Sequence, residues 1–302
     1  MADGTFRRIW RAIRQLDPGK VTGEADLPFT LAIVGASQDE ATAIREFVVG
    51  PSPSWEDLQC ADNVLRTYVL PLDDEQSGEI RKADFVLATE GAGLEGITRF
   101  DLSKPGERLR AIASSRRGTD LRLALASCLP SFRPEIARRI IREVSRENAI
   151  FVIATALGNV IPSPLLPIIG VAEAASDTIV LTTNQVRMLF MLGAVYGIKV
   201  GYSTQLREVG SIIAAAFGWR SLARNLVSKI PLGGGLVPKG AVAYAGTTVI
   251  GEGLIFYYTT GRKMTRREMQ AAFKQSYSGA AESVRSLVEK VRSGKVNPPA
   301  GG

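Results

Sequence analysis

The residues that come closest to a catalytic motif lie after the first apolar run of the chain. There, FTLAIVGA leads into GASQDEAT at residues 35–42, the place where a G-x-x-x-x-G-K-[ST] loop between a strand and a helix would hold nucleotide phosphates. Gly35 and Thr42 match this pattern, but Glu40 replaces its second glycine and Ala41 its lysine. These replacements remove a cation and add a carboxylate beside the phosphates, so we expect nucleotide binding to be weak or absent.

Two local structures fit this segment. One is a degenerate phosphate loop, in which Gly35, Ser37 and Thr42 would contact a nucleotide and Thr42 would hold magnesium; the other is an ordinary strand-to-helix turn. The N-K-x-D element that recognises guanine is absent from the sequence, and only Glu75 and Gly78 partly match the D-x-x-G element that binds magnesium. The sequence therefore predicts a GTPase-like region that lacks the elements needed for hydrolysis.

Composition excludes several further classes of catalyst. The sequence has no histidine, which removes the side chain most often used as general base, triad member and zinc ligand. Its two cysteines, Cys60 and Cys128, are far apart and outside any C-x-x-C spacing, so we expect neither a zinc site nor a disulfide framework, and a reducing compartment. We expect no catalytic residue, no metal and no cofactor.

The N-terminal segment FRRIWRAIRQL at 6–16 has the pattern of a basic amphipathic helix that ends at Asp17, Pro18 and Gly19. One hypothesis is a helix lying in a membrane interface, and the other is a helix docked on its own protein. The residues that would contact lipid are Phe6, Arg7, Arg8, Trp10, Arg11 and Arg14.

The overall charge indicates an anionic partner. The chain carries 37 Lys and Arg against 30 Asp and Glu, a net charge of +7. Aromatic residues are only 7% of the sequence and do not alternate with basic ones, as they do in proteins that stack single-stranded bases. We therefore expect membrane lipid or another anionic surface as partner, and no nucleic acid.

Short apolar runs separated by polar stretches predict an α/β region from Phe29 onward. The expected strands are the runs at 29–36, 63–72, 84–91 and 121–127, with a helix at 41–49 after the first of them. After Ser131 helical patterns dominate, and Thr265 with Glu268 makes a capping box that opens a last helix. The fold class is thus α/β plus all-α: a small degenerate P-loop-like α/β domain followed by a helical domain with an apolar hairpin.

The domains follow from these patterns. We expect a basic amphipathic N-terminal arm (1–28), a degenerate GTPase-like α/β domain (29–130), a helical membrane-associated domain (131–264) and a C-terminal helix with a disordered tail (265–302).

The helical region contains one apolar stretch long enough to span a membrane, at 149–172, which is free of charges but interrupted by three prolines. It predicts a hairpin, either inserted in a membrane or buried as core. The helix at 177–197 carries Arg187 near its centre, where a charge costs about 2.5 to 3.5 kcal/mol to insert, so a bundle helix is favoured. Glu252 is one candidate partner for this arginine. The expected structural polar network is Asp177, Asn184, Gln185 and Arg187.

The helical half resembles the bacterial YcjF-like, GTPase-associated domain of unknown function. The similarity runs from Leu121 to Tyr258 and includes an Asn-Gln-x-Arg-Met element at 184–188 and an Ile-Pro-x-Gly-Gly element at 230–234. The resemblance implies a helical domain found fused to or encoded near a small GTPase domain, with several members described as membrane-associated. It brings no established catalytic residues, and a complete phosphate loop would be expected where GASQDEAT stands here.

Three functions fit these patterns. The first is a non-catalytic, membrane-associated adaptor or scaffold at the cytoplasmic face of the bacterial inner membrane, with a GTPase or a second copy of the chain as protein partner. The second is a weak P-loop nucleotide-binding protein or NTPase. The third is a soluble helical scaffold in the cytoplasm whose apolar segments are buried in a homo-oligomer.

Overall fold

The computed structural model describes residues 2–89, 100–101, 103–157, 177–212 and 235–293. Its chain forms two compact units, which are described separately below. The α/β unit comprises residues 19–138 and 193–199, and the helical unit comprises residues 1–18, 139–192 and 200–302. The expected fold class of an α/β part plus an all-α part agrees with this division. The expected N-terminal arm (1–28) is divided between the two units, because residues up to Pro18 belong to the helical unit and those from Gly19 on belong to the α/β unit.

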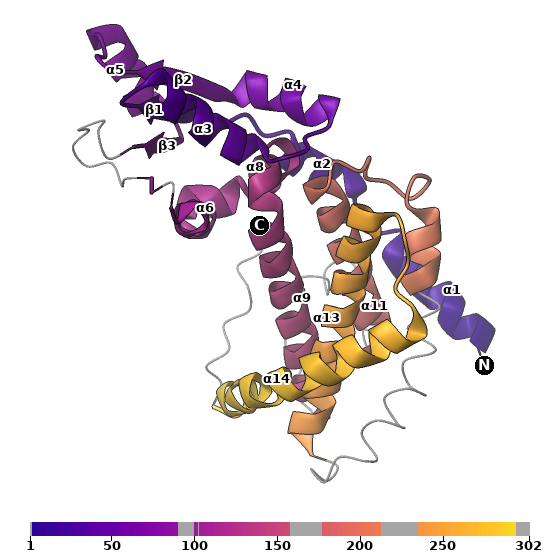
Figure 1. The fold of residues 1–302 in the computed structure, drawn as a ribbon. Coiled ribbons are helices and arrows are strands. Elements are labelled where there is room, and N and C mark those ends of the chain that lie inside the picture. Colours follow the sequence, from indigo (N-terminus) through magenta and orange to yellow (C-terminus); the bar gives the residue numbers. More distant parts are fainter. Residues whose placement is uncertain (1, 90–99, 102, 158–176, 213–234, 294–302) are drawn as a thin grey trace. The chain divides into compact units, whose positions relative to one another are not determined.

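The α/β unit is built on a small parallel sheet of β1 (Leu31–Gly35), β2 (Leu65–Val69) and β3 (Phe85–Ala88). The strand order is β2-β1-β3 (Figure 1), and Leu31 is paired with Leu65 on one side and Phe85 on the other. Every residue of β1 is buried, as is typical of a central parallel strand covered on both faces. Three of the strands expected from the sequence are therefore confirmed.

Helices connect and cover these strands. In chain order they are α2 (Pro18–Ala25), α3 (Gln38–Val49), α4 (Trp55–Val64), α5 (Asp74–Lys82), α6 (Pro105–Ser114), α7 (Arg116–Asp120) and α8 (Arg122–Cys128), followed by the 3-10 turn η2 (Pro130–Phe132). On one face of the sheet, Ala32 and Val34 of β1 pack with Ile80 of α5. Because α3, α4 and α5 each begin at a side-chain cap, from Ser37, Ser54 and Asp73, the helix starts are specified locally.

The strand expected at 121–127 is wrong, because this segment is helix α8. Leu123, Ala124, Leu125 and Ala126 are all buried, so burial does not alternate as it would in a half-exposed strand. A short apolar run of leucine and alanine carries little strand signal of its own, and both residues are strong helix formers.

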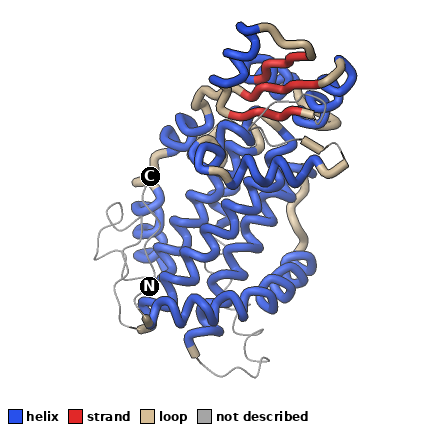
Figure 2. Tube along the Cα trace, turned by 90° about the vertical axis from the view of Figure 1, so that its left-hand side faces the viewer, coloured by secondary structure: helices blue, strands red, loops and turns tan. Residues whose placement is uncertain are grey.

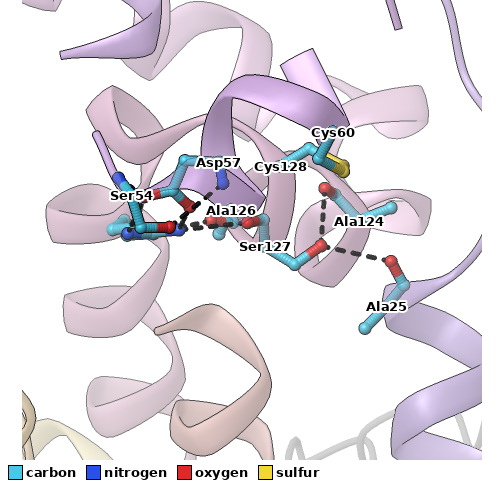
Figure 3. Close-up of polar contacts among 9 residues, drawn as sticks. Ala25, Ser54, Asp57, Cys60, Ala124, Ala126, Ser127 and Cys128 are labelled. Carbon is cyan, nitrogen blue, oxygen red and sulfur yellow. Dashed lines mark hydrogen bonds and ion pairs between the residues drawn. A yellow bond between two sulfur atoms is a disulfide. The ribbon is translucent and has the colours of Figure 1, made fainter. Parts of the chain in front are cut away.

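The prediction that Cys60 and Cys128 form no disulfide is also wrong. Cys60 of α4 and Cys128 of α8 form a disulfide across 68 residues of sequence, with their Cα atoms 5.1 Å apart (Figure 3). Sequence spacing gave no sign of this pairing, because it depends on how two helices pack in space.

The helical unit contains α1 (Ala2–Ile13), most of α9 (Arg133–Ala156), most of α11 (Asp177–Val195), α13 (Leu236–Thr260) and α14 (Arg266–Arg292). Helices α9, α11 and α13 lie side by side, and α14 runs across them (Figures 1 and 2). The apolar core joins Ile153 of α9, Ala245 and Val249 of α13, and Phe273 and Leu287 of α14. The capping box expected at Thr265 and Glu268 is confirmed as the start of α14.

Small residues let these helices approach closely. A Cβ atom at Gly251 of α13 would lie 2.5 Å from Cγ1 of Ile141 on α9, and one at Gly240 would lie 2.8 Å from Cγ1 of Val284 on α14. The apolar stretch expected at 149–172 forms the end of α9 up to Ala156, and its part from 158 on lies outside the described residues.

Gly35, the first residue of the phosphate-loop pattern, has a structural role that a substitution can test. A Cβ atom here would lie 2.6 Å from the backbone N of Ala41 and 2.6 Å from the backbone O of Ser37, and backbone atoms cannot move aside cheaply. We expect Gly35→Ala to lower the free energy of unfolding by about 2 kcal/mol. The measurement is urea unfolding followed by circular dichroism.

Gly78 is the matched control, because it lies inside α5 and a Cβ atom added there would have no atom within 4 Å. Gly78→Ala should raise the free energy of unfolding by roughly 0.5 to 1 kcal/mol through helix propensity. Equal and small effects of the two substitutions would show that the turn at Gly35 is not as close-packed as described.

Candidate functional site

The turn between β1 and α3 is short, and protein groups already occupy its hydrogen-bonding positions. Only Ala36 and Ser37 lie between the strand and the helix, which begins at Gln38. The Ser37 hydroxyl accepts from the backbone N–H of Glu40 at 3.3 Å. The backbone N–H of Ala36 donates to two acceptors, the Glu40 carboxylate at 3.0 Å and the Thr89 hydroxyl at 3.1 Å.

Each residue expected to bind nucleotide is thus placed by this turn. Gly35 permits the tight exit from β1, Ser37 caps α3, and the Thr42 hydroxyl is 3.4 Å from Nε2 of Gln38 within the first turns of the helix. An incoming phosphate would meet the Glu40 carboxylate at the helix N-terminus, where an anion is most favoured. This geometry supports the ordinary strand-to-helix turn, while nucleotide affinity itself stays a prediction.

Helix α1 packs its apolar side within the helical unit. Ile9, Ala12 and Ile13 are fully buried, and Leu16 just beyond the helix is 8% exposed. The Tyr202 hydroxyl lies between two carbonyls at the end of the helix, donating to Ile13 O or to Leu16 O, the latter at 2.8 Å. Burial, helped by the Asp17 carboxylate, raises the pKa of Tyr202 to about 12, which keeps this hydroxyl protonated as a donor.

The basic side of α1 remains exposed to solvent. Arg7, Arg8, Arg11 and Arg14 are all exposed, and the Arg14 guanidinium lies 5.9 Å from the centre of the Trp10 ring. A shallow depression of about 550 Å³ is lined here by Arg7, Trp10, Arg11, Arg14 and Gln15. The side chain of Phe6, the remaining residue expected to contact lipid, lies outside the described residues. In this structure α1 is therefore docked on its own protein by its apolar side, and only its basic side is left exposed.

The interior of the helical unit contains a layer of amides and hydroxyls. Asn184 Nδ2 of α11 donates to Asn148 Oδ1 of α9 at 2.7 Å, and Asn148 Nδ2 donates to Thr247 Oγ1 of α13 at 2.8 Å. Gln185 Nε2 donates to the same threonine hydroxyl at 3.2 Å. A second link joins the hydroxyls of Ser145 and Thr248, 3.0 Å apart. Three helices are thereby tied together by buried polar side chains.

Arg187 forms an ion pair with Glu147 of α9, so Glu252 is not its partner. The expected polar network thus acquires three members that were not foreseen, Asn148, Thr247 and Glu147, while the side chain of Asp177 lies outside the described residues. Within this network, Asn184 Oδ1 and Arg187 Nε are buried and have no hydrogen-bond partner among the described residues.

Asp57 of α4 is the centre of one group of buried polar contacts in the α/β unit. Asp57 completes the capping box with Ser54 and pairs with the guanidinium of Arg133, while that guanidinium also donates to Ala126 O at 3.0 Å and to Ser127 O at 3.1 Å (Figure 3). Asp57 is 7% exposed, so this is a buried carboxylate satisfied by both backbone and side-chain donors. It was not a candidate at the level of sequence, although S-x-x-D at 54–57 is a helix-start signal.

Two properties of the described residues concern membrane and metal binding. One helical segment, Thr178–Val195, is long and apolar enough to cross a membrane, with a mean hydropathy of 1.3, and 89% of it is buried inside the protein. Within the described part of the chain, no group of three or more His, Cys, Asp and Glu residues is arranged to hold a metal ion.

No protein-family model, curated protein or solved structure matches this chain.

The β1–α3 turn predicts how the protein responds to nucleotides. We expect the wild-type protein to bind GTP or ATP with a Kd no lower than about 1 mM, because Glu40 and Ser37 already satisfy the amides that a phosphate would use. Isothermal titration calorimetry with magnesium measures this directly. Micromolar binding would overturn the prediction.

The double substitution Glu40→Gly and Ala41→Lys restores the phosphate-loop motif and tests whether nucleotide binding returns with it. Ala41 is fully buried, so the new lysine must bury its charge or distort α3. We expect the double variant to melt at a lower temperature without gaining affinity, whereas Glu40→Gln should melt near the wild type because an amide oxygen can still accept from Ala36. A gain of micromolar affinity would support the degenerate phosphate loop.

The Arg187–Glu147 pair predicts a large effect on stability. Arg187→Ala removes the guanidinium that pairs with the Glu147 carboxylate, which is only 18% exposed, so the free energy of unfolding should fall by about 3 kcal/mol in urea titrations. Arg138→Ala is the matched control, since its side chain is 66% exposed and its pair with Glu135 on the same helix should contribute about 0.5 kcal/mol or less. Losses of equal size would show that Arg187 is effectively solvated.

Proposed function

We propose that this protein is a non-catalytic scaffold that attaches to an anionic membrane surface, the cytoplasmic face of the bacterial inner membrane, through the exposed basic side of α1. Its supporting observation is the orientation of that helix: Ile9 and Ile13 are buried in the helical unit while Arg7, Arg8, Arg11 and Arg14 are exposed. The proposal includes membership of the YcjF-like, GTPase-associated family for residues 121–258, and therefore a GTPase or a second copy of the chain as protein partner.

The packing of α1 decides the kind of attachment. Ile9 and Ile13 already bury their side chains in the protein, so they add nothing to lipid binding unless the helix undocks. Four arginines near an anionic surface contribute about 1 kcal/mol each, and a total of about 4 kcal/mol corresponds to a Kd near 1 mM. Attachment by this helix alone is thus weak, reversible and sensitive to salt, as suits a scaffold that gains affinity from a partner or from self-association.

A second candidate is a soluble cytoplasmic scaffold that forms a homo-oligomer, and it is consistent with an α11 that is buried within its own chain and not available to cross a membrane. The helix carries Asn184, Gln185 and Arg187 at positions where they bond to α9 and α13. A helix with these internal partners belongs to a protein core rather than to a lipid bilayer. The two candidates share the same fold and differ only in whether α1 binds lipid.

Vesicle flotation distinguishes them. At low salt, the wild-type protein should float with phosphatidylglycerol vesicles and not with phosphatidylcholine vesicles, and binding should disappear at about 1 M salt, where the Debye length is about 3 Å. Changing Arg7, Arg8, Arg11 and Arg14 to glutamine should abolish flotation.

A control variant with the same loss of charge replaces four exposed basic residues of the α/β unit with glutamine and should still float. These residues are Arg81, Lys82, Arg110 and Arg116. Equal loss in both variants would point to net charge alone, and no flotation of the wild type would leave the soluble scaffold.

Trp10 fluorescence, with Trp55 and Trp219 changed to phenylalanine, distinguishes electrostatic docking from insertion. If α1 stays packed, vesicles should leave the emission maximum nearly unchanged, because the half-buried Trp10 keeps its surroundings. A blue shift on adding vesicles would mean that α1 leaves the helical unit and enters the interface.

A further inference from the structure

The disulfide of the α/β unit joins two helices with different exposure to solvent. Cys128 is the last residue of α8 and is 6% exposed, with Leu125, Ala126 and Leu129 around it in the sequence fully buried. Cys60 is only partly buried, and its helix α4 carries the exposed residues Trp55 and Leu58. A dissolved thiol or disulfide can therefore reach the sulfur of Cys60 more easily than that of Cys128.

The two helices are also held together by contacts that do not involve sulfur. Asp57 lies on α4 three residues before Cys60, and it pairs with Arg133. The same guanidinium donates to the carbonyls of Ala126 and Ser127, the two residues before Cys128 (Figure 3). Because these bonds do not involve sulfur, reduction of the disulfide breaks none of them, and we expect the two thiols to stay close enough to form the disulfide again.

We infer that Cys60 and Cys128 form a reversible redox pair that exchanges with a low-molecular-weight disulfide such as glutathione disulfide, with Cys60 as the entry sulfur and Cys128 as the resolving sulfur. In the first step the Cys60 thiolate attacks one sulfur of glutathione disulfide, and one glutathione thiolate leaves and takes up a proton. In the second step the Cys128 thiolate attacks the Cys60 sulfur and expels the second glutathione in the same way. Two protein thiols are oxidised and one glutathione disulfide is reduced to two thiols.

This pair does not depend on the membrane proposal, since it lies wholly in the α/β unit. Its consequence is a covalent crosslink between α4 and α8 whose presence follows the thiol–disulfide balance of the surroundings. A closed loop of 68 residues restricts the unfolded chain, so the oxidised protein should unfold at a higher urea concentration than the reduced protein.

Single-cysteine variants of the full chain test the assignment of the two sulfurs. After reduction and exposure to glutathione disulfide, Cys128→Ser should accumulate a glutathione adduct at least about tenfold faster than Cys60→Ser, because Cys60 is the more exposed of the two cysteines. The wild type should lose both thiols without keeping an adduct, as read by intact mass spectrometry after an acid quench. In denaturant the two variants should react at equal rates, which controls for intrinsic reactivity.

Three results would overturn the inference: a wild-type protein that keeps both thiols in excess glutathione disulfide, adduct formation at equal rates in the two folded variants, or a urea midpoint that is the same before and after oxidation of the wild type. If Cys128→Ser fails to fold by circular dichroism, Cys128→Ala preserves the apolar surroundings of this position and serves the same comparison.

Discussion

The side-chain amide of Asn148 is the group on which the packing of the helical unit depends. It is fully buried on α9, accepts a hydrogen bond from Asn184 of α11 and donates one to Thr247 of α13. A buried amide without partners costs a few kcal/mol, so sliding any of these helices by one turn would be strongly unfavourable. Apolar contacts such as those of Gly251 with Ile141 allow the helices to come close, but the amide layer selects the register in which they do so.

The α/β unit uses the same principle with an ion pair in place of amides. Asp57 accepts from the start of its own helix and from Arg133, whose guanidinium in turn satisfies two carbonyls at the end of α8. A lysine could not make these contacts together, because its ammonium group lacks the planar fork of donors. One arginine thus fixes the ends of two helices and, with them, the approach of Cys60 to Cys128.

Much of this fold could be predicted from local sequence signals, whereas the contacts between residues far apart in the sequence could not. The three strands and the start of α14 follow from apolar runs and a capping box, which are read within a few residues. The segment SQDE at 37–40 also has the S-x-x-E form of a helix start, and this signal would have placed the beginning of α3 at Gln38 instead of later. By contrast, Asn148 and Thr247 are 99 residues apart, and no pattern in the sequence shows that two polar residues on separate apolar helices will meet.

The packing of α1 on the protein also determines how its basic face can bind a membrane. An amphipathic helix such as α1 can bury its apolar side in lipid or in protein, and the choice depends on whether the protein offers a complementary surface. Here the helix is docked, and the Tyr202 hydroxyl holds its end by donating to the Leu16 carbonyl at 2.8 Å, while the Tyr202 ring packs edge-on against Phe190 with ring centres 5.3 Å apart. Once the apolar side is used internally, the arginines must point outward as a group. A basic face presented in this way acts through charge, with a range set by salt, rather than through insertion.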